Sequence, residues 1–126
     1  QQAQLALVRA QLASADNQPK QALTELQQAV ALDPLSGEAL LTLAQWYENR
    51  GNIELASISY SRAATIKEVQ IPALQAQAQL EINRQQYQSA LRLLQQVLQV
   101  APQRQDIADN IRSLQQLVRQ QRSGGA

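Results

Sequence analysis

The feature that most constrains this chain is an internal repeat, because the sequence matches itself when it is shifted by 34 residues. Six apolar columns recur in three copies without an insertion, which chance does not readily produce even in a chain rich in alanine and leucine. A period of roughly 20 to 50 residues is the signature of a solenoid or another repeat architecture. The columns are Ala10, Ala44 and Ala78; Leu12, Trp46 and Leu80; Ala22, Ala56 and Ala90; Leu26, Tyr60 and Leu94; Ala29, Ala63 and Val97; and Leu32, Ile66 and Val100.

Each period is predicted to contain two helices joined by a short turn. In the second copy, apolar residues from Leu40 to Tyr47 follow the i, i+3, i+4, i+7 spacing of one helix face. Gly51 then suits the left-handed conformation that closes a helix, and Asn52 suits the cap of the next one. The sequence therefore predicts a helix-turn-helix hairpin in each period.

Prolines mark the helix boundaries. Pro19 is well placed as the first residue of a helix. Pro34 and Pro102 stand two periods apart and end the preceding helices, because proline disfavours the helical conformation of the residue before it. Glu68 occupies the corresponding position between the second and third copies.

The composition supports an all-α fold. Gln, Ala and Leu, which are all good helix formers, make up about half of the chain, and aromatic residues are only 3%. No apolar stretch approaches the length of about 18 residues that a membrane-spanning helix needs. The net charge of +1 gives no global attraction to nucleic acid or to an anionic membrane.

The missing residue types exclude most catalytic chemistry. The chain has no His, the commonest general base and transition-metal ligand, and no Cys, so thiol catalysis and zinc fingers are excluded. Asp106 and Asp109 are interpreted as favourable charges at a helix start rather than as an acid–base pair. With only four glycines there is no glycine-rich phosphate loop. We therefore predict no enzyme activity, no metal site and no cofactor.

The 34-residue hairpin resembles the tetratricopeptide repeat (TPR). The family pattern asks for a small residue late in the first helix, an Ala early in the second, a large apolar residue four positions on, another Ala three later, and a closing Pro. The second copy matches best, with Ala44, Ala56, Tyr60 and Ala63, and the first closes with Leu32-Asp33-Pro34. The resemblance implies an all-α fold, a right-handed α-solenoid of antiparallel hairpins with about seven helices.

The resemblance also sets the expected domain boundaries. One domain is expected over residues 1–122, with repeats at 3–36, 37–70 and 71–104, a capping helix at 105–122 and a flexible tail at 123–126. A capping helix shields the open end of a solenoid. Because the chain contains no Met, we expect it to be a processed chain or a piece of a longer one.

Three polar residues depart from the pattern. Gln77 and Glu81 occupy positions of the third copy that are usually apolar, which predicts that this helix is rotated or less tightly packed. Arg9 at an equivalent inner position of the first copy indicates that the outer side of this helix faces solvent.

The resemblance implies a non-catalytic scaffold that binds a partner peptide or helix in the concave groove lined by the first helix of each repeat. Amides and a few aliphatic side chains occupy the groove positions, and the Lys and Arg of the family's carboxylate clamp are missing. The expected partner-binding residues are Gln4, Leu7, Val8, Gln11, Leu41, Thr42, Gln45, Glu48, Asn49, Gln75, Gln79, Ile82 and Asn83.

Two other functions stay open. Leu5, Leu7 and Val8 form a candidate surface for self-association, as a homo-oligomer, or for assembly within a larger bacterial envelope protein. The Gln-rich, Cys-free composition is similar to that of tetratricopeptide segments of bacterial envelope proteins and favours a periplasmic or envelope location. A helical repeat that binds nucleic acid is the least favoured function. Six of the eleven cationic residues lie in the last third of the chain, but no aromatic residues interleave with them.

Overall fold

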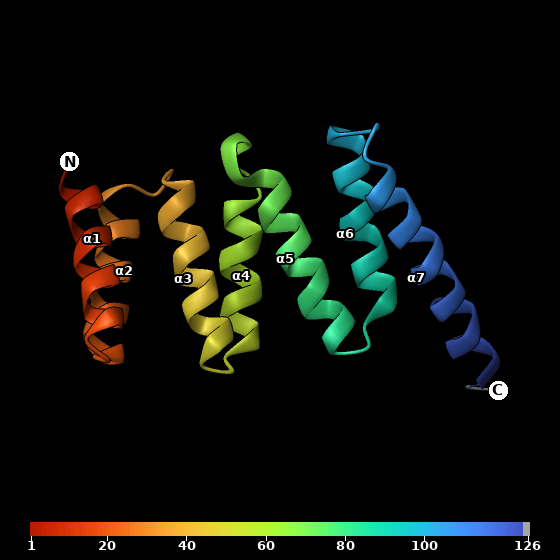
Figure 1. Ribbon diagram of the computed structural model, residues 1–126, viewed down its shortest axis with the longest axis horizontal. Coiled ribbons are helices and arrows are strands. Elements are labelled where there is room, and N and C mark those ends of the chain that lie inside the picture. Colours follow the sequence, from red (N-terminus) through yellow and green to blue (C-terminus); the bar gives the residue numbers. More distant parts are fainter. Residues whose placement is uncertain (125–126) are drawn as a thin grey trace. The chain divides into compact units, whose positions relative to one another are not determined.

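The computed structural model describes residues 1–124, and within them it consists of seven α-helices and one short 3-10 helix (Figure 1). This confirms the expected all-α fold. The chain divides into two compact units, Gln1–Val69 and residues from Gln70 onward, and the single repeat domain expected over residues 1–122 stays a prediction. The division falls one residue before the expected start of the third repeat at residue 71.

The first unit contains two helix hairpins. Helix α1 (Gln2–Ala15) pairs with α2 (Pro19–Leu32), α3 (Gly37–Asn49) pairs with α4 (Ile53–Ala63), and α2 also contacts α3. The short 3-10 helix η1 (Lys67–Val69) follows at the position where the other repeats have a proline, and it packs against α3.

The second unit contains one hairpin and one further helix. Helix α5 (Gln70–Asn83) pairs with α6 (Tyr87–Val100), and α7 (Gln105–Gly124) packs on α6. Helix α7 starts where the capping helix was expected but is longer, since Ser123 and Gly124 continue it instead of belonging to a tail. Residues 125–126 of the expected tail lie outside the described residues.

Four of the six apolar columns form the cores of the two units. The columns that begin at Ala10, Ala22, Leu26 and Ala29 are buried in all three copies. Most of their residues are alanines, and short side chains let paired helices approach closely. In the other two columns Leu12, Leu32 and Val100 are exposed, whereas Leu80 is buried.

The turn inside each hairpin requires a left-handed backbone at the same repeat position. Among residues 1–124, the three residues with positive φ are Asn17 (φ 58°), Gly51 (φ 80°) and Gln85 (φ 61°), each 34 residues from the next. The expected roles of Gly51 and Asn52 are confirmed, because the Asn52 side chain accepts a hydrogen bond from the backbone N–H of Leu55 at 3.2 Å. Gly and Asn tolerate this conformation better than other residues, so Gln85 is the strained member of the set.

We predict that Gln85→Gly raises the free energy of unfolding by about 0.5–1 kcal/mol, because Gly removes the clash of Cβ in the left-handed region. The reciprocal change Gly51→Gln is expected to lower it by a similar amount. Urea denaturation of both variants measures the two effects. The control is Gln95→Gly on the exposed surface of α6, which should cost about 1 kcal/mol. A destabilised Gln85→Gly variant would contradict the prediction.

Two exposed charge pairs lie near the start of α7. Arg104 donates from Nε to Oδ1 of Asp106 at 2.9 Å and from Nη2 to Oδ2 at 2.7 Å. These hydrogen bonds lower the pKa of Asp106 to about 2. Arg112 donates to Asp109 one turn further on. Both acids are therefore paired with arginines, in agreement with a structural rather than an acid–base role.

We predict that NMR titration of the Asp106 carboxyl gives a midpoint near pH 2 and that Arg104→Ala moves it toward about 4, the ordinary value. Because the pKa is lowered in the folded state, the contribution of the pair to stability is complete above about pH 4 and is lost as the pH falls toward 2. Asp106→Asn should remove this part of the pH dependence. A wild-type midpoint near pH 4 would show that the pair does not persist in solution.

Candidate functional site

The first unit carries a pocket of about 260 Å³ between α1 and α3, which we call the α1–α3 pocket. Amide and hydroxyl side chains share its walls with the indole of Trp46, and the buried residues Ala10 and Leu26 form its apolar part. Four of the expected partner-binding residues line it, namely Gln11, Thr42, Gln45 and Asn49. Ser14, which was not expected, completes the lining.

The Trp46 ring is held by its neighbours. Its edge-to-face contact with Tyr47 has a centroid separation of 5.6 Å and an interplanar angle of 81°. The guanidinium of Arg50 lies 5.6 Å from the indole centroid, within cation–π range. Trp46 is half-buried and forms part of the pocket wall. Such contacts fix the orientation of the aromatic wall.

Two expected binding residues of this unit are engaged elsewhere. Leu7 is only 1% exposed and belongs to the core, so its expected role as a groove residue is wrong. The physical reason is that Ala6 stands where α3 and α5 have Leu40 and Leu74, and the next residue, Leu7, supplies the large core side chain instead. The carboxylate of Glu48 accepts a 2.7 Å hydrogen bond from the buried Tyr60 hydroxyl.

The remaining expected residues of the first unit lie outside the pocket lining. Gln4 and Val8 are exposed on α1, and Leu41 is half-buried on α3. On α1, Leu5, Val8 and Leu12 are 50%, 40% and 60% exposed and follow the i, i+3, i+7 spacing of one helix face. They form an exposed apolar surface, which we call the α1 stripe.

The second unit carries a related pocket of about 340 Å³ between α5 and α7, which we call the α5–α7 pocket. Three expected residues, Gln75, Gln79 and Ile82, line it from α5. Asn83 does not line it, but its Oδ1 accepts a 3.0 Å hydrogen bond from Nε2 of Gln79 and so orients that amide. The rest of the lining is Ala78, Leu94, Ile107, Asn110, Ser113, Leu114 and Leu117.

Helix α7 supplies a wall of this pocket, which was not predicted from the sequence. It was interpreted only as a cap, although the 34-residue register continues into it. Ser113 falls in the same column as Gln11, Gln45 and Gln79. Continuing the register beyond Pro102 would have placed Asn110, Ser113 and Leu117 at groove positions.

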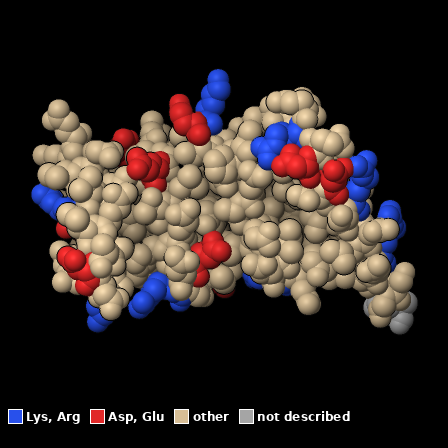
Figure 2. All heavy atoms as spheres, viewed as in Figure 1, with Lys and Arg blue, Asp and Glu red and all other residues tan. Residues whose placement is uncertain are grey.

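Neither pocket is lined by a charged residue. On the face drawn in Figure 2, charged groups of both signs are scattered or adjoin each other, and most of the described surface is uncharged. Several arginines of the last third of the chain are paired, including Arg84 with Glu81 and Arg104 with Asp106. The pockets therefore offer amides, hydroxyls and apolar surface to a ligand.

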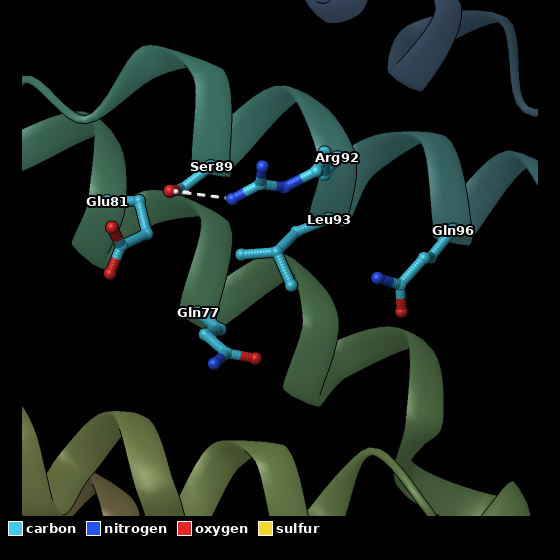
Figure 3. A pocket seen from close by; sticks show the side chains of 6 residues that line it. All are labelled: Gln77, Glu81, Ser89, Arg92, Leu93 and Gln96. Carbon is cyan, nitrogen blue, oxygen red and sulfur yellow. Dashed lines mark hydrogen bonds between the residues drawn. The ribbon is translucent and has the colours of Figure 1, made fainter.

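A third cavity, of about 240 Å³, lies between α5 and α6 (Figure 3). Gln77 and Glu81 enter it from α5, and α6 contributes Ser89, Arg92, Leu93 and Gln96. Arg92 donates from Nη2 to the Ser89 hydroxyl at 3.2 Å. Gln77 is nevertheless buried, with 9% of its surface exposed, so looser packing of this helix stays a prediction.

Two other kinds of site are absent from residues 1–124. No group of three or more His, Cys, Asp or Glu side chains in this range is placed to hold a metal ion. In the same range no helix has the length and apolar character needed to cross a membrane.

Solved structures with the same fold are tetratricopeptide domains. The Sgt2 TPR domain from Aspergillus fumigatus has a TM-score of 0.74 at 13% identity, over 98% of this chain and 83% of that one. The first TPR domain of Spaghetti (RPAP3), bound to an HSP90 peptide, has a TM-score of 0.71 at 14% identity, over 93% of this chain and 95% of that one. The Yersinia enterocolitica chaperone SycD, in complex with a peptide of the translocator YopD, has a TM-score of 0.69 at 14% identity, over 98% of this chain and 94% of that one.

The chain therefore has a tetratricopeptide-repeat-like fold. No family model matches its sequence, and no curated protein matches it in sequence.

Proposed function

We propose that this protein is a non-catalytic interaction scaffold that binds a partner peptide or helix through the α1–α3 and α5–α7 pockets. The observation that carries this proposal is the character of the two pockets, in which amides and hydroxyls surround buried aliphatic side chains. Amides can pair with the backbone N–H and C=O groups of a peptide, while the apolar parts can hold its side chains. Structures of the same fold with bound peptides support it.

The proposed partner segment is uncharged. The HSP90 peptide in the Spaghetti structure, SRMEEVD, has three acidic side chains among its last four residues. Neither pocket of the present chain has a Lys or Arg in its lining to pair with such groups. A charged side chain would lose its hydration there without gaining an ionic partner, which is costly.

An array of capped, uncharged peptides tests the proposal. We expect Gln45→Ala combined with Asn49→Ala to lower the affinity for bound peptides by about 5- to 150-fold, because two hydrogen bonds of about 0.5–1.5 kcal/mol each are lost. Both residues are exposed, so the fold should be retained. Gln28→Ala combined with Gln95→Ala, two exposed glutamines outside both pockets, is the matched control. Unchanged binding by the first variant would contradict the proposed site.

Self-association is the second candidate function, and the α1 stripe favours it. Three large apolar side chains on one exposed helix face suit contact with a second copy of the chain or with an adjoining part of a larger protein. Sedimentation over a range of protein concentrations distinguishes the two functions. A chain that stays monomeric at every concentration would count against self-association. Peptide binding would then remain as the proposed function.

A further inference from the structure

The two pockets are the same structural site, repeated two periods apart. Every residue that lines the α1–α3 pocket has a counterpart in the lining of the α5–α7 pocket two 34-residue periods later in the chain. The pairs are Ala10 and Ala78, Gln11 and Gln79, Ser14 and Ile82, Leu26 and Leu94, Thr42 and Asn110, Gln45 and Ser113, Trp46 and Leu114, and Asn49 and Leu117.

Part of the site is identical in both copies. The buried alanines Ala10 and Ala78 correspond, as do the buried leucines Leu26 and Leu94. Gln11 and Gln79 place the same amide at the same position of each pocket. Both copies therefore share an apolar part and one polar group that can pair with a peptide backbone.

The other walls differ in chemistry. Ser14 and Asn49 of the α1–α3 pocket are replaced by Ile82 and Leu117 in the α5–α7 pocket. The aromatic wall of Trp46 is replaced by Leu114. The α5–α7 pocket also gains Gln75 and Ile107. One copy of the site thus has an aromatic wall, and the other has aliphatic side chains in its place, while both keep amide and hydroxyl groups in their lining.

The size of each pocket suits one side chain of a peptide. Their volumes of about 260 and 340 Å³ lie at or below the lower end of the range for drug-sized ligands, about 300–1,000 Å³. The α1–α3 pocket offers an indole for ring contact beside the polar groups of Ser14 and Asn49. In the α5–α7 pocket, Ile82, Leu114 and Leu117 offer aliphatic contact.

We propose that the two pockets select different side chains of an uncharged peptide. The α1–α3 pocket takes an aromatic side chain with a polar tip, such as tyrosine, and the α5–α7 pocket takes a branched aliphatic side chain, such as leucine. This inference rests on the proposed peptide-binding function and adds a side-chain preference to each site.

The test uses the full 126-residue chain and capped peptides of Gly, Ser and Ala with a single guest residue, Tyr or Leu. The side-chain NH₂ signals of Gln11 and Gln79 are matched NMR reporters, since each amide lines one pocket. We expect the Tyr peptide to shift the Gln11 signal at a concentration at least fivefold lower than that which shifts Gln79. The Leu peptide should show the reverse order.

A swap variant tests the cause of the preference. Trp46→Leu combined with Asn49→Leu copies Leu114 and Leu117, and it should make the Gln11 reporter prefer the Leu peptide. Gln28→Leu, outside both pockets, should leave both preferences unchanged. The comparison of guests in the wild-type chain does not depend on the folding of any variant.

The outcomes separate the two levels of the proposal. Equal responses of Gln11 and Gln79 to both guests, within twofold, would overturn the selectivity and leave peptide binding intact. No response of either reporter to either peptide would overturn the selectivity together with the proposed function.

Discussion

Replacing Tyr60 with alanine is expected to lower the free energy of unfolding by about 3–5 kcal/mol, the usual cost of deleting a buried aromatic side chain. Tyr60 is only 1% exposed and is among the largest fully buried side chains of the described residues. Its hydroxyl donates to Oε1 of Glu48 at 2.7 Å and so joins α4 to α3. Burial and this hydrogen bond to a carboxylate raise the pKa of Tyr60. Urea denaturation measures the loss.

Two milder substitutions separate packing from hydrogen bonding at this position. Tyr60→Phe removes only the hydroxyl and should cost about 1.5–3 kcal/mol, the usual contribution of a hydrogen bond to a charged group. Tyr60→Leu copies Leu26 and Leu94 of the same column, so its cost should fall between those of the phenylalanine and alanine variants. A loss below about 1.5 kcal/mol for Tyr60→Ala would mean that this hairpin does not depend on its buried aromatic residue.

Replacing Gly37 with leucine is expected to lower the free energy of unfolding by about 2–3 kcal/mol through overpacking. A Cβ at Gly37 would lie 2.5 and 2.9 Å from the two Cγ atoms of Val69 and 3.3 Å from Cγ2 of Ile66. Val69 is β-branched and cannot swing its methyl groups aside freely. Glycine is therefore required at the first turn of α3 because η1 packs directly on it.

A double-mutant cycle with Val69→Ala identifies this cause. Removing the two Cγ atoms should restore a large part of the stability that Gly37→Leu loses, because the two sites are in contact. Gly51 is the matched control, since its φ is 80° and no atom lies within 4 Å of the position that a Cβ would take there. Gly51→Ala should cost about 1 kcal/mol through backbone strain, and Val69→Ala should not relieve it. Additive effects of Gly37→Leu and Val69→Ala would contradict the overpacking explanation.

Much of the fold follows from the 34-residue period. Alanine columns such as Ala22, Ala56 and Ala90 are small because helices approach closely there, and the repeat of that constraint is visible in the sequence. The turns are visible for a similar reason, since one left-handed residue is needed in each hairpin and Gly51 marks its position. Local backbone and packing requirements of this kind restrict the residue type at a position, so they can be recognised in the sequence.

The site was less predictable because it depends on which face each helix presents. In α1 the position that corresponds to Leu40 holds the small Ala6, and the next residue, Leu7, is buried as the large core side chain. Glu48 was expected in the groove, but its carboxylate turns to the Tyr60 hydroxyl. The side-chain direction of a half-buried residue is set by its tertiary partner, which spacing alone does not show.

The most direct test of the proposed function is the location of a bound peptide on the chain. We propose to add the tightest uncharged peptide from the array to isotopically labelled protein and to follow the backbone amide signals by NMR. We expect the largest shifts on α1, α3, α5 and α7, around the residues that line the two pockets. Shifts concentrated on α2, α4 and α6, with those pocket residues unchanged, would contradict peptide binding at this site.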